Sequence, residues 1–163
     1  MRLRRSTRTK VALLVIVAGA LALVGYALAA ISPGPQYRGT LVQPIHANKD
    51  GVKVKTHGST DLIAQDIVLH PGDNSGWHYH PGVVLIEATG PPGNHLLFHD
   101  KCHVITIPVD QPPAVSHGFY ESGHKPGLVE SPSTNTSDIT IHVMYILPTG
   151  APPRVNTDPP HCN

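Results

Sequence analysis

Two histidines, His78 and His80, are the residues of this chain whose type and spacing most clearly predict chemistry. On an extended strand, side chains two positions apart project from the same face. Imidazole nitrogen is a common ligand of first-row divalent metals, and three such ligands leave a further position open for water or substrate. The spacing predicts two ligands of a divalent transition metal, although a structural pair of histidines has the same spacing.

The residues around this pair make the prediction more specific. Residues 72–82 read GDNSGWHYHPG, with a glycine six positions before His78 and a Pro-Gly pair directly after His80. This pattern resembles the first motif of the cupin superfamily. From about Asp61 to Pro148 the chain resembles small exported bacterial cupin-domain proteins. The resemblance implies a small β-barrel whose first motif supplies two His and a Glu, and whose second motif supplies one more His, to a bound metal.

The chain departs from the cupin pattern at the position of the glutamate. Counted from His80, the family's Glu falls near Val84 or Leu85, where this sequence has apolar side chains. Glu87 is the nearest carboxylate. It faces inward only if the strand shifts its register by one residue, and we expect it on the surface instead.

The second cupin motif is present in a blurred form. The turn at residues 119–126 matches it, and the resemblance implies His124 as the third metal ligand, whereas a turn histidine fits the spacing equally well. His117 is a weaker substitute. His142 alternates with apolar residues on the last expected strand, so it faces either the barrel interior or the outer surface.

Short strand-like runs surround these motifs, rich in β-branched residues and bounded by Gly, Pro, Asn or Asp. No segment after residue 31 shows an apolar period of 3.6 residues with capping signals. With the resemblance, the pattern predicts an all-β fold, a small cupin-type jelly-roll β-barrel preceded by one N-terminal hydrophobic helix. The expected strands are Thr40–Ile45, Val52–Thr56, Leu62–Leu69, Val83–Ala88, His95–His99, Val104–Ile107 and Ile139–Leu147.

Residues 1–31 have the features of a targeting segment. Arg and Lys residues precede Val11–Ile31, a run without charged residues that is about as long as a membrane-spanning helix. The segment is either a signal peptide cleaved near Ala27–Ala30 or a transmembrane anchor, and its length favours the anchor. Because the positive charges stay in the cytoplasm, both alternatives predict an extracytoplasmic domain, secreted or membrane-anchored.

The rest of the chain divides into three predicted parts. These are a Pro/Gly linker at 32–39, the cupin barrel at 40–148 and a Pro-rich C-terminal tail at 149–163. Cys102 and Cys162 are the only cysteines. In an oxidising compartment they predict one disulfide that fastens the tail to the barrel. Two unconnected thiols are the alternative, because spacing alone does not establish geometry.

Composition and motifs limit the possible functions. The formal net charge is +1 and the positive excess precedes the apolar run, so nothing predicts nucleic-acid binding. We expect an exported cupin that binds a divalent metal, with a small-molecule ligand in the barrel. The alternatives are a metal-dependent enzyme of the oxygenase or isomerase type, using Glu87 or Tyr79 as acid or base, and a metal-free binding module. The resemblance also implies a homodimer.

Overall fold

The computed structural model describes residues 31–109 and 117–162. Apart from Ile31, the predicted targeting segment at 1–31 lies outside these residues, and so does its expected helix. All regular elements of the described residues are β-strands, which confirms the all-β class. Within the same residues there is no helix long and apolar enough to cross a membrane. The strands are β1 (Ser32–Leu41), β2 (His46–Lys49), β3 (Val52–Lys55), β4 (Thr60–Leu69), β5 (His78–Tyr79), β6 (Val83–Thr89), β7 (His95–Asp100), β8 (His103–Pro108), β9 (His117–Ser122), β10 (Gly127–Glu130), β11 (Ile139–Pro148) and β12 (Val155–Asn156).

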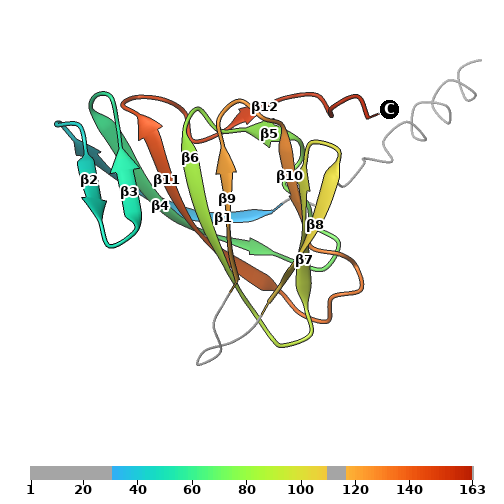
Figure 1. The fold of residues 1–163 in the computed structure, drawn as a ribbon. Coiled ribbons are helices and arrows are strands. Elements are labelled where there is room, and N and C mark those ends of the chain that lie inside the picture. Colours follow the sequence, from blue (N-terminus) through green and yellow to red (C-terminus); the bar gives the residue numbers. More distant parts are fainter. Residues whose placement is uncertain (1–30, 110–116, 163) are drawn as a thin grey trace, which may run out of the picture.

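The strands form two five-stranded antiparallel sheets that enclose the core (Figure 1). One sheet has the order β1-β4-β11-β6-β9, and the other has the order β12-β5-β10-β7-β8. From β4 to β11 the chain changes sheet at each connection except the one between β7 and β8, which pair with each other. Eight strands that alternate in this way between two sheets form a jelly roll, in agreement with the predicted architecture. The hairpin of β2 and β3 projects from one side of the barrel (Figure 1).

The core follows from the two-residue period of the long strands. Along β11 the buried positions alternate with exposed or half-buried ones, and buried Val143 and Tyr145 flank the exposed Met144. Strands β4 and β6 alternate in the same way. The inward side chains of both sheets therefore meet in one apolar core, and each fully buried Val, Leu or Ile stabilises the fold by about 1.5–3 kcal/mol.

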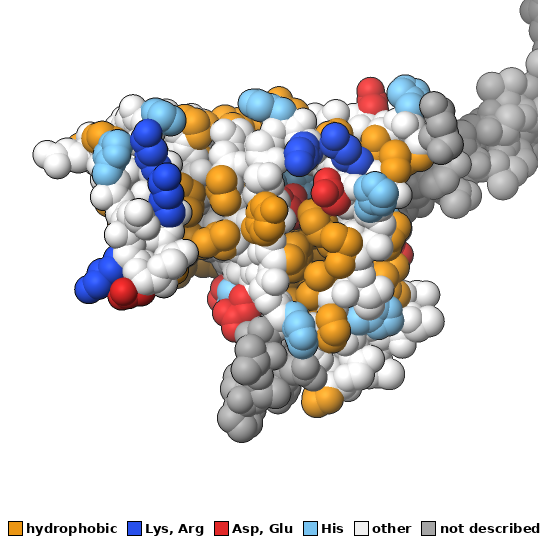
Figure 2. All heavy atoms as spheres, in the orientation of Figure 1, with side chains coloured by type: hydrophobic (Ala, Val, Ile, Leu, Met, Phe, Trp, Pro, Cys, Tyr) orange, Lys and Arg blue, Asp and Glu red, His pale blue; other side chains and the backbone are white. Residues whose placement is uncertain are grey.

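Part of the outer surface of the barrel is apolar, because some outward-facing strand positions carry large hydrophobic side chains. Exposed apolar side chains group over β6, β9 and β8 on the face seen in Figure 2. They are Val83, Leu85, Val104, Ile105 and Tyr120.

The predicted linker at 32–39 is wrong, because these residues belong to strand β1. β1 pairs with β4 from Ser32↔Val68 to Leu41↔Thr60, with a register shift between Pro33 and Gln36. β1 lies at the edge of its sheet, where prolines are tolerated because one side of the strand needs no hydrogen-bond donors. Of the strand expected from Thr40 to Ile45, only Thr40 and Leu41 belong to β1, which begins earlier, and residues 42–45 are not in a strand.

A buried carboxylate fastens β1 to the end of the barrel. Asp61 accepts hydrogen bonds from the Thr40 hydroxyl at 2.6 Å, the Gly150 N–H at 2.9 Å and the Arg38 guanidinium at 2.6 Å. The hydrogen bond from Thr40, followed by that from Gly150, holds the pKa of Asp61 below its usual value. The carboxylate therefore stays ionised and joins three segments that are distant in sequence.

The C-terminal tail packs against the barrel. Strand β12 pairs with β5, with Val155 opposite Tyr79 and Asn156 opposite His78. Farther along, a disulfide joins Cys102, in the turn between β7 and β8, to Cys162, with 5.6 Å between their Cα atoms. The predicted disulfide is confirmed, and it holds the tail at the sheet that carries the histidine motif.

Candidate metal centre

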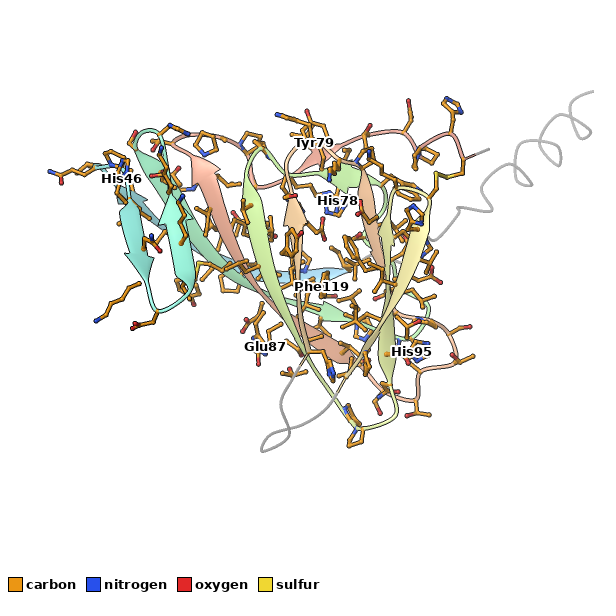
Figure 3. All side chains as sticks on the ribbon, in the orientation of Figure 1. His46, His78, Tyr79, Glu87, His95 and Phe119 are labelled. Atoms are coloured by element: carbon orange, nitrogen blue, oxygen red, sulfur yellow. A yellow bond between two sulfur atoms is a disulfide. The ribbon has the colours of Figure 1, made fainter. Side chains whose placement is uncertain are left out.

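His78 and His80 lie inside the barrel, where the residues are only 5 % and 4 % exposed. Their ring centroids are 4.8 Å apart and the ring planes are nearly perpendicular. Figure 3 shows His78 between the two sheets. Gly72 and Gly76 in the preceding turn have φ values of +92° and +67°, a conformation that L side chains rarely adopt. These glycines thus allow the turn that delivers the histidine pair to the interior.

Backbone carbonyl groups determine which nitrogen of each histidine is available to a metal. The Nδ1 of His78 donates to the carbonyl oxygen of Gly76 at 2.8 Å, and the Nδ1 of His80 donates to that of Pro153 at 2.5 Å. Because a carbonyl oxygen only accepts, both Nδ1 atoms carry a hydrogen. The Nε2 lone pairs are then free to bind a cation, and such carbonyl partners are typical of metal-binding histidines.

Burial keeps the His78 ring neutral. It lowers the pKa of His78 from 6.5 to about 4, because the charged imidazolium loses its hydration inside the barrel. At neutral pH the ring is therefore unprotonated at one nitrogen, the form in which imidazole binds metals.

A third ligand comes from β9. Glu121 is 7 % exposed, and its Oε2 lies 3.1 Å from the Nε2 of His80. Donor atoms of His78, His80 and Glu121 all lie within 4.8 Å of one another, and these three form the metal-ligand group among the described residues. The structure thus brings a carboxylate to the predicted histidine pair.

The register of β6 and β9 explains how Glu121 takes this place. Glu121 pairs directly with Val84, one of the two positions at which the cupin pattern would have its Glu. Residues directly opposite in an antiparallel pair point to the same side of the sheet. The buried Val84 therefore packs in the core while the carboxylate enters the interior from the neighbouring strand.

The contact between His80 and Glu121 fits a bound cation. If Nδ1 of His80 carries its only hydrogen, Nε2 and the carboxylate oxygen are two acceptors at 3.1 Å. Either a proton on Nε2 or a cation bound by both atoms satisfies them. Ligands that bind one ion at about 2.0–2.2 Å lie about 3–4 Å apart, as these two do. Two imidazoles and a carboxylate suit Zn²⁺, Fe²⁺, Mn²⁺ or a similar divalent ion.

His124, the third ligand implied by the resemblance, lies elsewhere. Its side chain is exposed, and its ring centroid is 4.9 Å from that of Tyr79. It is not part of the group that contains His78, His80 and Glu121. The position of His124 agrees with the alternative of a turn histidine.

The other candidates from the sequence face outward. Glu87 is exposed on β6, between the buried Ile86 and Ala88 (Figure 3). His142 is exposed on β11, and its Nδ1 lies 2.8 Å from an Asp66 carboxylate oxygen. His117 is exposed at the start of β9. Glu87 thus lies on the surface, as expected. His142 takes the outward one of its two predicted orientations.

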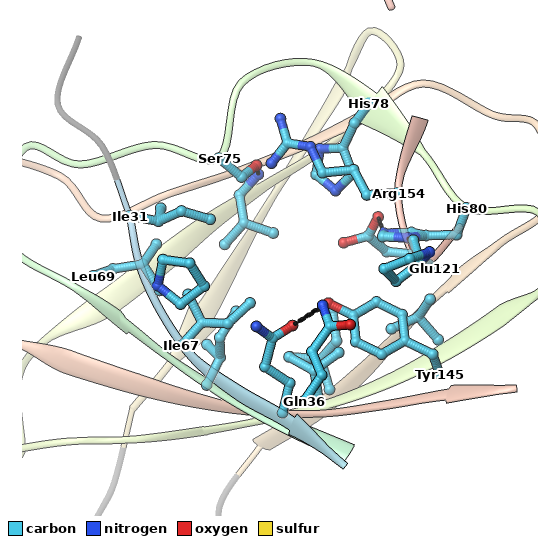
Figure 4. Close-up of a pocket in the computed structure, with 18 residues that line it drawn as sticks. Ile31, Gln36, Ile67, Leu69, Ser75, His78, His80, Glu121, Tyr145 and Arg154 are labelled. Carbon is cyan, nitrogen blue, oxygen red and sulfur yellow. Dashed lines mark hydrogen bonds and ion pairs between the residues drawn. The ribbon is translucent and has the colours of Figure 1, made fainter. Parts of the chain in front are cut away.

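A cavity of about 390 Å³ adjoins the three ligands (Figure 4). His78, His80, Glu121 and Arg154 lie along one side of it, and Ile67 and Leu69 lie on the opposite side. The volume falls at the lower end of the range of small-molecule sites. The candidate metal centre therefore opens into a space with one polar and one apolar side.

Glu121 was not among the predicted site residues, although it lies in the stretch matched to the second cupin motif. Strand β9 was not expected, because HGFYES lacks the regular alternation of a half-buried strand. Pro153 and Arg154 were also missed, since a Pro-rich tail carries no periodic signal. The one available signal was Cys162, whose predicted disulfide requires the tail to lie against the barrel.

No protein-family model and no curated protein matches the chain. Among solved structures, it is similar to a cupin-like protein of Thermotoga maritima (TM-score 0.46, 11 % identity, covering 63 % of this chain and 79 % of that one). A second is a protein of unknown function with a cupin-like fold from Ralstonia eutropha (TM-score 0.44, 16 % identity, covering 59 % of this chain and 50 % of that one). A third is a structure described as that of DMSP lyases (TM-score 0.44, 16 % identity, covering 60 % of this chain and 44 % of that one). The chain spans about half the length of the last two. These similarities transfer no family, activity or ligand to this chain.

Proposed function

We propose that this chain is an extracytoplasmic metal-binding domain of the cupin type, which holds a divalent transition metal on His78, His80 and Glu121 and a small ligand in the adjoining cavity. The observation that carries the proposal is the convergence of the three buried donors within 4.8 Å. Buried charged groups are costly unless paired, and a divalent ion would compensate the Glu121 carboxylate while using both imidazoles.

The metal, when bound, supplies a Lewis acid at one end of the cavity. The carbonyl oxygens of Gly76 and Pro153 orient the imidazoles, and apolar side chains line part of the cavity beside them. Tyr145 lines the same cavity, and burial raises its pKa to about 12, so its phenol stays neutral.

An extracytoplasmic location is part of this proposal. A disulfide such as Cys102–Cys162 persists in oxidising compartments. The charged and apolar composition of residues 1–31 supplies a way to reach such a compartment, by cleavage or as an anchor.

Elemental analysis of the purified full-length chain tests the proposal. We expect about one equivalent of a divalent transition metal in the wild-type protein and loss of that metal in His78→Ala. His103→Ala, at an exposed position of β8, is the matched control and should retain the metal. Metal that survives His78→Ala would overturn the proposal.

A metal-dependent enzyme is the second candidate, favoured by the cavity that adjoins the three ligands. Of the two residues predicted as acid or base, Glu87 lies on the outer face of β6, and the ring of Tyr79 lies against that of the exposed His124. Binding therefore takes precedence over catalysis. Mass spectrometry of a ligand that copurifies with the chain separates the two. A ligand recovered unchanged after incubation with metal-loaded protein supports binding, and its conversion to a new product supports an enzyme.

A further inference from the structure

We infer that the cavity takes a small organic anion, a carboxylate with a short hydrocarbon body, and that Arg154 binds its carboxylate group. The inference deepens the proposed function and rests on it in one respect, namely that Glu121 is a metal ligand. Its other supports are the position and partners of Arg154, the distribution of polar groups in the cavity and the cavity's size.

Arg154 is held at the cavity by the chain on both sides of it. The preceding residue, Pro153, bonds to His80 through its carbonyl oxygen, and the following residues of β12 pair with β5. The N–H of Thr157 donates to the carbonyl oxygen of Trp77 at 3.1 Å. This backbone is fastened at the histidine motif, so the guanidinium has a defined position beside His78 (Figure 4).

The guanidinium of Arg154 retains unused donors. Its Nε donates to Asn156 at 2.7 Å, and within residues 31–109 and 117–162 no carboxylate lies within ion-pair distance of it. An arginine presents five N–H donors in a planar fork that matches a carboxylate. Its remaining donors can therefore bind an anion that enters the cavity.

The charges of the cavity favour an anion. Glu121 is the one acidic side chain among its described lining residues, and Arg154 is the one permanently charged cation. A divalent ion on His78, His80 and Glu121 would leave the cavity with a net positive charge. An entering carboxylate reduces that excess, whereas a cationic ligand increases it.

The other polar groups of the wall are already engaged with one another. The amide of Gln36 donates to the Oε1 of Gln65 at 3.2 Å, and the amide of Gln65 donates to the carbonyl oxygen of Gly34 at 2.9 Å. The Tyr145 hydroxyl lies 3.4 Å from the same Gln65 oxygen. These contacts leave Arg154 as the strongest available anion donor in the described wall.

The opposite wall and the volume define the rest of the ligand. Ile67, Leu69 and Ile141, on the paired strands β4 and β11, give that side an apolar surface, and the cavity measures about 390 Å³. A small ligand gains from burying apolar area there while its charged end meets Arg154. A short-chain carboxylate has both parts, and a fully polar anion lacks the apolar one.

Isothermal titration with hexanoate and its neutral isostere hexanamide tests the inference on the purified full-length chain. We expect hexanoate to bind about 10-fold more tightly than hexanamide. Arg154→Gln should lower hexanoate affinity about 10-fold and leave hexanamide affinity unchanged, because only the anion uses the guanidinium. Arg154→Lys keeps the charge without the fork and should recover part of the preference.

Two controls accompany the titration. Lys53→Gln removes a positive charge from the exposed hairpin strand β3 and should change neither affinity. Metal content and far-UV circular dichroism of Arg154→Gln should match the wild-type protein. The inference is overturned if wild-type protein shows no preference for hexanoate, if it binds neither compound, or if Arg154→Gln retains the preference.

The same measurements separate this inference from the proposed function. A hexanoate preference that requires Arg154 in a chain that binds no metal supports the anion site and overturns the metal site. Metal binding that depends on His78, without any preference for hexanoate, supports the metal site and overturns the anion site.

Discussion

The Nε2 of His80 and the Oε2 of Glu121 lie 3.1 Å apart inside the barrel and come from opposite sheets. His80 directly follows β5 of one sheet, and Glu121 lies on β9 of the other. A metal bound by both would link the two sheets from within. The contact between His80 and Glu121 therefore connects metal affinity with the stability of the barrel.

Glu121→Gln should weaken metal binding at least about 10-fold, because the amide keeps the size of the side chain but removes the negative charge that binds the ion. Competition with a chromogenic chelator measures the change. His124→Gln is the control and should leave the affinity unaltered, since its exposed ring lies against Tyr79. Equal losses in the two variants would restore His124 to the ligand set and remove the basis for assigning Glu121.

The second prediction concerns acid and the metal-free protein. The pKa of His78 is about 4 in the folded chain, against 6.5 for an unperturbed histidine, so between these values the unfolded chain binds the extra proton. The stabilisation is present above pH 6.5 and is lost as the pH falls toward 4. We expect His78 to account for a decrease of about 2–3 kcal/mol in the free energy of unfolding between pH 7 and 4.5.

Urea denaturation at the two pH values, with chelator present, measures this decrease. His78→Gln should show a smaller decrease than the wild-type protein, and His103→Gln, whose side chain is exposed, should behave as wild type. The same decrease in wild type and His78→Gln would contradict the assignment.

The third prediction concerns the disulfide. Replacing Cys102 and Cys162 together by Ser opens a loop closed over a sequence separation of 60 residues, and we expect a loss of about 2–4 kcal/mol in stability. Metal should also dissociate faster, because a less restrained tail holds the Pro153 carbonyl oxygen less firmly against His80. Urea denaturation and the rate of metal transfer to a chelator measure the two effects.

Reductant provides the control for the disulfide. Dithiothreitol should speed metal release from the wild-type protein and leave the double Ser variant unchanged. A wild-type release rate that does not respond to reduction would mean that the tail keeps its position without the bridge.

The fourth prediction concerns Gly82, which ends the histidine motif. A Cβ at this position would collide with the carbonyl oxygen of Ile146 and crowd Leu147 on β11. Gly82→Ala should therefore cost about 1–3 kcal/mol in stability, as overpacking typically does. Gly39→Ala is the matched control, because a Cβ on Gly39 meets nothing within 4 Å. Thermal unfolding compares the two, and equal effects would contradict the close approach of Gly82 to β11.

Local patterns were sufficient to predict much of the barrel. The runs of β-branched residues indicated the long strands, since alternation with a period of two is a property of consecutive residues. The turn glycines and the spacing of His78 and His80 likewise indicated a pair on one face. Strand β1 was mistaken for a linker, because Pro33 and Pro35 suggest a break, and only its pairing with β4 shows that it is an edge strand.

The sequence by itself determined the all-β class, the histidine pair and the cysteine pair, because each depends on residue types and short spacings. Tertiary structure decided the rest of the site. Glu121 reaches the histidines because the ladder between β6 and β9 sets it opposite Val84, and Arg154 reaches the cavity because β12 and the disulfide hold the tail at β5. Such registers arise from hydrogen bonds and packing between strands far apart in the chain, and the residues of one strand do not specify its partner.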